Sequence, residues 1–145
     1  MKFWDSSAVV PLLMQESSTE RFGEVYAGDA RMIVWWATEA ECAAALSRRE
    51  REISGAGGQA VAQAFIRLDE LGRHWSEIAP VGEVRATARR LLRTHWLRAA
   101  DALQLAAALI ACEGKPEMME FVCADERLIA AARLEGLTII APEVE

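Results

Sequence analysis

LRAADALQLAAALIA, at residues 97–111, is the stretch of this sequence that most strongly decides the fold. Alanine and leucine favour a helix here, and the apolar residues lie on nearly every side of it, which predicts burial on more than one face. Asp101 stands near the start of this helix, and Arg98 is the only basic residue close to it. Because an unpaired buried carboxylate is costly, Asp101 serves either the helix start or chemistry.

Short β-like runs alternate with longer helical patterns along the whole chain. Five runs have the composition of strands, at residues 2–5, 32–37, 77–81, 120–124 and 137–141. Six stretches are helix-like, at about 18–28, 39–53, 57–73, 83–95, 99–113 and 126–135. This alternation predicts a parallel sheet with helices on both faces. The expected fold class is therefore α/β, a three-layer α/β/α sandwich around a central parallel sheet of about five strands.

Glycine and proline mark the expected boundaries between these elements. The GAGG sequence at 55–58 predicts a turn between two antiparallel helices. Gly114 and Pro116 end the long helix before the fourth strand, and Gly136 caps the last helix before the fifth.

Length and composition limit the classes of function. The 145 residues fit a single domain over 1–145, and 52% hydrophobic residues are enough to fill one core. The 16 basic and 22 acidic residues give a formal charge of -6, which argues against broad electrostatic capture of nucleic acid but leaves room for a local basic face.

Cysteine usage and apolar runs predict a cytoplasmic protein that does not enter a membrane. Cys42, Cys112 and Cys123 are scattered in apolar runs, as expected of small buried hydrophobes in a reducing compartment, and no Cys/His cluster suggests zinc. Asp5 and Pro11 interrupt any signal-peptide core. No apolar run reaches the roughly 18 residues that a membrane span needs.

Four acids fall where strands and helices meet. Asp5 follows the first strand and Asp125 follows the fourth, while Glu41 and Asp101 lie at the starts of two helices. Ligands of parallel α/β sheets bind at the carboxyl ends of the strands. Carboxylates gathered there repel one another unless a cation joins them, and Mg²⁺ and Mn²⁺ prefer such oxygen ligands. A site of this kind can hydrolyse a phosphodiester.

Each acid also has a purely structural explanation. Asp5 could form an Asx turn, and Asp125 could be the N-cap of the last helix. The sequence from Thr38 to Glu41 fits a T-x-x-E capping box in which the glutamate reaches back to the cap. Asp101 would stabilise its helix by roughly 0.3–1 kcal/mol through its interaction with the helix dipole. These effects could account for any one acid, whereas the placement of all four at one edge of the sheet favours a site.

Four segments resemble, in order, the signature segments of PIN-domain proteins, and more narrowly those of VapC-type toxin ribonucleases. They are FWDSSAVVPLL at 3–13, TEAECAAALSRRE at 38–50, LRAADALQLAAAL at 97–109 and FVCADERLIAAARLEGL at 121–137. The resemblance covers nearly the whole chain and depends on order and spacing together. It implies a single PIN domain over residues 1–145.

The same resemblance implies the roles of individual residues. Four acids match the family's quartet that binds Mg²⁺ or Mn²⁺ and activates water for RNA cleavage: Asp5, Glu41, Asp101 and Asp125. Glu39 competes with Glu41, but Glu41 stands five residues before Leu46, as the family's acid stands before its leucine. Three neighbouring positions could assist the metal site or orient a carboxylate: Ser6, Ser7 and Glu126. The family further implies a homodimer, a small antitoxin partner that obstructs the acidic pocket, and a structured RNA as substrate.

The segment RATARRLLRTHWLR at 85–98 has no acid and is the best candidate for contacts with RNA phosphates. Its arginines are Arg85, Arg89, Arg90, Arg93 and Arg98. The alternative is a solvated helix face with three apolar residues turned inward: Ala88, Leu91 and Leu92. A second charged run, SRRERE at 47–52, predicts ion pairs on a helix surface.

The tryptophans could serve one of two purposes, burial in the core or stacking on RNA bases. Trp35 and Trp36 are adjacent in an expected strand, so they point to opposite faces, and both lie in the core if helices cover both faces. Trp4 or Trp96 could stack on RNA bases, although burial is expected for most of the five tryptophans.

Together these features predict a Mg²⁺- or Mn²⁺-dependent endoribonuclease that acts as the toxin of a toxin-antitoxin pair. The alternative is a catalytically silent PIN-like module that binds RNA or protein. A receiver-like signalling domain is disfavoured, because Pro80 follows the third strand where that class needs an aspartate, and the only lysines, Lys2 and Lys115, lie far from the fifth.

Overall fold

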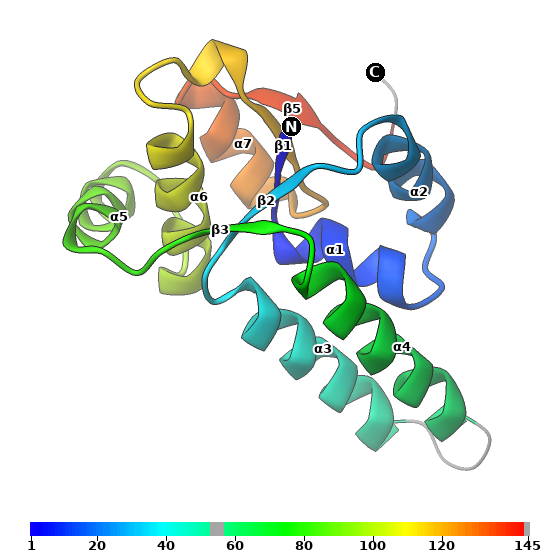
Figure 1. Cartoon of the computed structure of the whole chain (residues 1–145). Coiled ribbons are helices and arrows are strands. Elements are labelled where there is room, and N and C mark those ends of the chain that lie inside the picture. Colours follow the sequence, from blue (N-terminus) through cyan, green and yellow to red (C-terminus); the bar gives the residue numbers. More distant parts are fainter. Residues whose placement is uncertain (53–56, 144–145) are drawn as a thin grey trace.

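Five short parallel strands form the centre of the molecule (Figure 1). The computed structural model describes residues 1–52 and 57–143. The strands are β1 (Lys2–Trp4), β2 (Met32–Trp35), β3 (Ser76–Ile78), β4 (Glu120–Val122) and β5 (Thr138–Ile140). They pair in the order β3-β2-β1-β4-β5, and every pair is parallel. The predicted central sheet is therefore confirmed, with each strand close to its expected position.

Helices cover both faces of this sheet. Within the described residues they are α1 (Ser6–Leu13), α2 (Thr19–Gly28), α3 (Thr38–Glu52), α4 (Gly57–Gly72), α5 (Gly82–Thr94), α6 (Ala99–Ala111) and α7 (Glu126–Leu134), with a 3-10 turn, η1, at Pro116–Met118. The first four helices lie on one face and α5 to α7 on the other, which confirms the three-layer α/β/α sandwich (Figure 1). None of the described helices is long and apolar enough to cross a membrane.

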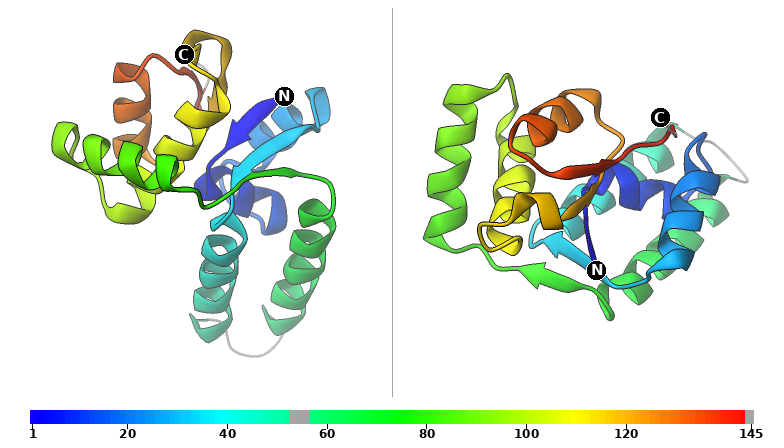
Figure 2. Two further views of the ribbon diagram at one scale, coloured as in Figure 1. Left: turned by 60° about the vertical axis from the view of Figure 1, so that its left-hand side comes forward. Right: turned by 90° about the horizontal axis from the view of Figure 1, so that it is seen from above.

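Helices α3 and α4 form an antiparallel pair that extends away from the sheet (Figure 2). The turn predicted at residues 55–58 falls between them. Its first two residues lie outside the described part of the chain, and Gly57 and Gly58 already belong to α4.

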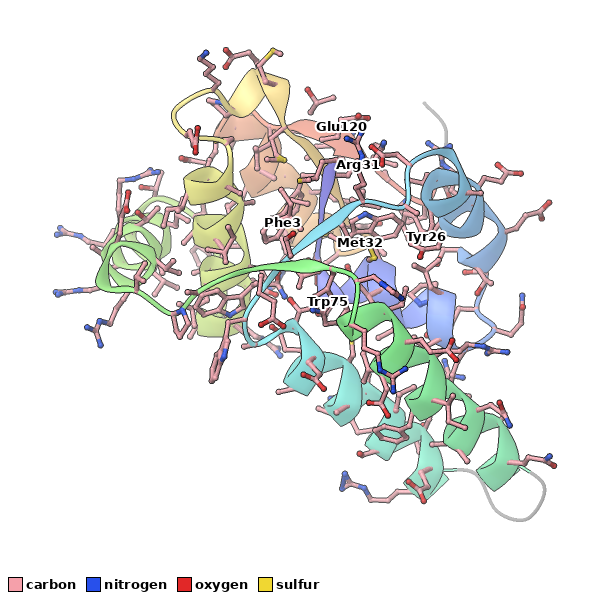
Figure 3. All side chains as sticks on the ribbon, viewed as in Figure 1. Phe3, Tyr26, Arg31, Met32, Trp75 and Glu120 are labelled. Carbon is pink, nitrogen blue, oxygen red and sulfur yellow. The ribbon has the colours of Figure 1, made fainter. Side chains whose placement is uncertain are left out.

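Adjacent residues of the central strands point to opposite faces and build two separate cores. Phe3 lies in the core beneath α5, α6 and α7, where its ring stacks on that of Phe121 with the centroids 5.7 Å apart. The next residue, Trp4, is fully buried in the core beneath α1 to α4. Figure 3 shows Phe3 on the side of α6, and Met32 and Trp75 beside α1 and α4. This alternation explains why both faces of the sheet require helices.

One tryptophan that was predicted to lie in the core is exposed. Trp35 is buried, but Trp36 is 55% exposed because β2 ends at Trp35 and the chain then leaves the sheet. The expectation that both lie in the core is therefore wrong for Trp36. Burial of Trp4 also excludes it from base stacking, whereas Trp96 is 93% exposed.

The sequence pattern does not predict helix α1. Pro11 lies inside it, and proline lacks the backbone N–H that an internal helical position donates. The helix forms because its apolar side is buried against α3 and α4, so tertiary packing outweighs local preference. This helix matters for the site, since it begins directly after Asp5.

Gly136 ends helix α7 as the sequence predicts. Its φ is +95°, a left-handed conformation that favours glycine. The backbone N–H of Gly136 donates to the Arg133 carbonyl at 3.0 Å, and that of Leu137 donates to the Ala132 carbonyl at 3.1 Å. This pair of hydrogen bonds closes the helix and turns the chain into β5.

Replacing Gly136 by alanine should lower the free energy of unfolding by about 1–2 kcal/mol, because a side chain is strained at this φ. The added Cβ would also lie 3.3 Å from Cγ of Pro116. Urea unfolding measures the effect. Gly23→Ala in α2 is the matched control: its Cβ meets nothing within 4 Å, so the helix should gain roughly 0.5–1 kcal/mol. Equal stability of the two variants would contradict this account of the turn.

Candidate functional site

The strand order reverses at the centre of the sheet, where β1 has β2 on one side and β4 on the other. In open α/β sheets, ligands bind beyond the carboxyl ends of the strands at such a reversal. Asp5 directly follows β1, and Asp125 follows β4 at the start of α7. The Asp5 backbone N–H donates to the Val122 carbonyl at 3.0 Å, which holds these two strand ends together.

A pocket of about 310 Å³ is formed by residues of this edge and the helices around it. Its lining residues are Asp5, Ser6, Ser7, Val10, Glu41, Ala44, Ala45, Arg48, Asp101 and Asp125. The structure thus brings the four predicted acids and both predicted serines into one pocket. Two other candidates lie elsewhere: Glu39 is exposed outside this pocket, and Glu126 lines a different one beside Ile129. We call the first of these pockets the acidic pocket.

Asp5 is the most deeply buried of the four acids, at 3% exposure. Its Oδ2 accepts hydrogen bonds from the Ser7 backbone N–H at 3.0 Å and the Ser7 hydroxyl at 2.5 Å. The Ser7 hydroxyl oxygen accepts in turn from the Ala124 N–H at 2.9 Å, which ties α1 to the segment after β4. The Asx turn expected as an alternative therefore forms, and the same carboxylate still lines the pocket. Burial raises the pKa of Asp5, the bonds from Ser7 oppose the rise, and the charge of Asp101 adds to it.

Glu41 is held by two neutral donors. Its Oε1 accepts from the Ser6 hydroxyl at 3.2 Å and its Oε2 from Nε2 of Gln104 at 3.0 Å. Both oxygens are thus bound to other segments, so the capping-box explanation does not describe what this carboxylate does. Burial, and then the charge of Asp5, raise the pKa of Glu41 to about 7.

Gln104 is a member of the site that the sequence analysis missed. It lies one turn after Asp101 on α6, is fully buried, and donates both to Glu41 and to the Thr38 hydroxyl at 3.0 Å. Its own side-chain oxygen has no hydrogen-bond partner in the described part of the chain. The sequence did contain a signal for Gln104, because a glutamine in so apolar a helix needs a polar partner. Gln104 connects α6 to the start of α3.

The remaining two acids lie at the starts of helices. Asp101 is half-buried in the first turn of α6, and burial, followed by the charge of Asp125, raises its pKa. The backbone N–H of Arg98 and the charges of Arg98 and Arg127 oppose this rise. Asp125 is exposed and caps α7, because its Oδ1 accepts from the Leu128 N–H at 2.9 Å. Capping and pocket lining thus coincide at Asp125 as they do at Asp5.

Mutual repulsion links the acids into one electrostatic group: the pKa of Asp5 responds to Asp101, that of Glu41 to Asp5, and that of Asp101 to Asp125. In residues 1–52 and 57–143, no three His, Cys, Asp or Glu side chains lie close enough together to enclose a metal ion. The donor chemistry of the acidic pocket nevertheless fits a hard divalent cation, since the donors are carboxylates and hydroxyls.

The basic residues are arranged only partly as expected. All five arginines of residues 85–98 are exposed, but Arg90 forms an ion pair with Glu135 at 2.6 Å. Leu92 is also 41% exposed, so the expectation that it turns inward is wrong, and Val84 is buried on that face instead. In the other charged run, Arg49 pairs with Glu16 of a distant segment. Arg49 therefore pairs with a residue outside its helix, whereas the sequence predicted ion pairs within residues 47–52.

Arg48 lines the acidic pocket and was not predicted to do so. It follows Glu41 by seven residues, or two turns of α3, so the two side chains lie on one side of the helix. This spacing along the helix would have predicted that Arg48 lies near Glu41.

Comparison with solved structures shows a shared fold. A chain from the structure of FitAB bound to the IR36 DNA fragment matches with a TM-score of 0.68 and 15% identity, over 100% of this chain and 98% of that one. The crystal structure of PAE2754 from Pyrobaculum aerophilum matches with a TM-score of 0.62 and 18% identity, over 95% of this chain and 82% of that one. No family model and no curated protein matches the sequence. The PIN-like α/β fold expected from the sequence resemblance is thus confirmed.

The raised pKa of Glu41 predicts how the stability of the metal-free protein depends on pH. The ordinary value is 4.5 and the folded value is about 7, so between these pH values the unfolded chain releases its proton first. The free energy of unfolding should therefore fall as pH rises through this window and stay lower above it. Glu41→Gln removes this contribution, so its gain in stability over the unmodified protein should be larger at about pH 8 than at about pH 5.

Urea unfolding in EDTA at both pH values measures this difference. Glu39→Gln is the matched control, because Glu39 lies on the same helix, is exposed and stands outside the acidic pocket. A gain for Glu41→Gln that is equal at the two pH values would refute the assignment of this carboxylate as a group destabilised by its surroundings.

Proposed function

We propose that this protein is a Mg²⁺- or Mn²⁺-dependent endoribonuclease. One observation carries the proposal: four carboxylates from four distant segments line a single pocket at the carboxyl edge of the sheet, at the reversal of strand order. The PIN-like fold, which is typical of nucleases, supports it. So does the order of the four sequence segments that resemble VapC-type toxin ribonucleases.

The residues that would hold the metal are Asp5, Glu41, Asp101 and Asp125. A divalent ion held by these carboxylates would lower the pKa of a water molecule and would stabilise charge that develops on a phosphodiester. Binding would also offset the repulsion between the carboxylates, which explains why the protein retains Asp5, Glu41 and Asp101 although their pKa values are raised.

The other residues of the acidic pocket position these acids and the substrate. Ser7 fixes the Asp5 carboxylate through two hydrogen bonds to Oδ2, and no donor among residues 1–52 and 57–143 binds Oδ1, which remains available to a ligand. Ser6 and Gln104 fix Glu41 in the same way. Arg48 supplies a positive charge to the same pocket, where a guanidinium can donate two hydrogen bonds to a phosphate.

The wider setting follows from the resemblance to VapC-type toxins. We propose that the chain acts as a single PIN domain in the cytoplasm, as the toxin of a toxin-antitoxin pair. In this proposal it forms a homodimer, and a small antitoxin obstructs the acidic pocket until the toxin is released to cut structured RNA.

Asp101→Asn should abolish RNA cleavage while the fold is retained, because the substitution preserves shape and removes one metal-binding charge. The purified protein is incubated with total cellular RNA in Mg²⁺ or Mn²⁺, and the products are separated on a gel. Discrete products should form with the unmodified protein, disappear in EDTA, and be absent with Asp101→Asn and with the Asp5→Asn/Asp101→Asn double variant.

Glu39→Gln is the matched control for loss of an acid near the site, and it should cleave normally. Cleavage by the Asp101→Asn variant would exclude the role proposed for that carboxylate. If the folded protein, free of copurified inhibitor, binds RNA without cutting it under any of these conditions, the catalytically silent PIN-like module becomes the better description.

A further inference from the structure

A second pocket, of about 340 Å³, lies at the connection between α5 and α6. Its lining residues are Leu92, Arg93, Thr94, His95, Trp96, Leu97, Arg98 and Arg127. Trp96 is 93% exposed, although tryptophan is on average a well-buried residue. We call this the arginine–tryptophan pocket, and its composition requires an explanation that the acidic pocket does not give.

Three arginines from different parts of the fold meet in this pocket. Arg93 lies in the last turn of α5, Arg98 directly precedes α6, and Arg127 lies in the first turn of α7. No carboxylate in residues 1–52 or 57–143 lies within ion-pair distance of any of the three. Three cations gathered without ion pairs, in a chain of net charge -6, mark a site for an anion such as a phosphate.

The wall of the pocket is fixed by a hydrogen-bonded network. Nε2 of His95 lies 2.8 Å from Oε2 of Glu135, whose Oε1 accepts from Arg90 at 2.6 Å. The His95 backbone N–H donates to the Leu91 carbonyl at 2.8 Å. These contacts anchor the residue directly before Trp96 to both α5 and α7. The exposed indole is therefore presented from an anchored segment of backbone, which lowers the entropic cost of binding a ligand.

Residues of the arginine–tryptophan pocket lie close to acids of the acidic pocket. Arg98 precedes Asp101 by three residues, and Arg127 follows Asp125 by two. The charges of Arg98 and Arg127 both act on the pKa of Asp101, so the two groups are within electrostatic range of each other. Helices α6 and α7 also pack side by side (Figure 1). A chain of nucleotides that crosses the starts of these helices would occupy both pockets.

We propose that the arginine–tryptophan pocket binds a nucleotide of single-stranded RNA next to the cleaved bond, with its base stacked on Trp96 and its phosphate bound by Arg93, Arg98 and Arg127. This inference rests on the proposed nuclease function and adds a substrate subsite to it. An exposed aromatic ring beside a positively charged groove is the combination that binds single strands. The pocket thereby selects unpaired segments, since only an unstacked base can lie on the indole.

Binding is tested without cleavage, by fluorescence anisotropy of a short fluorescein-labelled oligouridylate in EDTA at several salt concentrations. Trp96→Ala should weaken binding by about five-fold or more, and Trp96→Phe should keep most of the affinity because phenylalanine still stacks. Arg98→Ala and Arg127→Ala should each reduce the slope of log K against log salt by about 0.7, as expected for loss of one phosphate contact to a single strand.

Two matched controls separate this pocket from general surface effects. Trp36→Ala removes the other strongly exposed tryptophan, and Arg73→Ala removes an exposed charge after α4 that lines neither pocket. Both should leave the affinity and the salt slope unchanged. Because Trp96 is almost fully exposed, its variants are expected to fold, and thermal unfolding verifies this.

The outcomes distinguish the subsite from the nuclease function. If the Trp96 and arginine variants bind as tightly as the unmodified protein, with the same salt slope, the subsite is refuted and the pocket becomes a candidate surface for a protein partner. If binding depends on Trp96 but no RNA is cut in Mg²⁺ or Mn²⁺, the subsite stands and the nuclease proposal fails. If the unmodified protein binds no oligouridylate in EDTA but cuts RNA in Mg²⁺ or Mn²⁺, the subsite is refuted and the nuclease proposal stands.

Discussion

The pairing of β1 with β4 is the constraint on which the rest of this structure depends. Phe3 is in register with Phe121 and Trp4 with Val122, so a single short ladder contributes apolar side chains to both cores. The same ladder is where the strand order reverses. It therefore fixes the carboxyl edge at which Asp5 and Asp125 emerge. Without this pairing the two cores would lose their centre, and the acidic pocket would lose two of its four carboxylates.

The acidic pocket is held together by neutral donors, while its charges remain uncompensated by ion pairs in the described residues. Ser7 binds Asp5, and Ser6 and Gln104 bind Glu41. Hydrogen bonds of this kind orient the carboxylates but do not cancel their repulsion, so burial and neighbouring charge still raise the pKa values of Asp5 and Glu41. The repulsion between these carboxylates thus destabilises the folded protein at this edge of the sheet, which is characteristic of functional sites.

Much of the fold, and the placement of four acids in one pocket, could be predicted from the sequence, because the relevant signals are local. Strand and helix periodicity, and the glycine that ends α7, are readable within a few residues. The failures have a shared cause. Helix α1 contains Pro11 and forms only because neighbouring helices bury it. Trp36 is exposed because β2 ends one residue before it, and Arg90 forms an ion pair with Glu135, which directly follows α7.

The sequence by itself determined the alternation of strands and helices, and it placed an acid at each of four junctions, because spacing along the chain encodes both. The tertiary structure alone decided which neighbours those acids have. Gln104 meets Glu41 across 63 residues of sequence, and Arg90 meets Glu135 across 45. Such contacts depend on which faces of the helices pack together, and no local pattern carries that information, so the partners of the acids and the anchoring of Trp96 emerge only when the chain is folded.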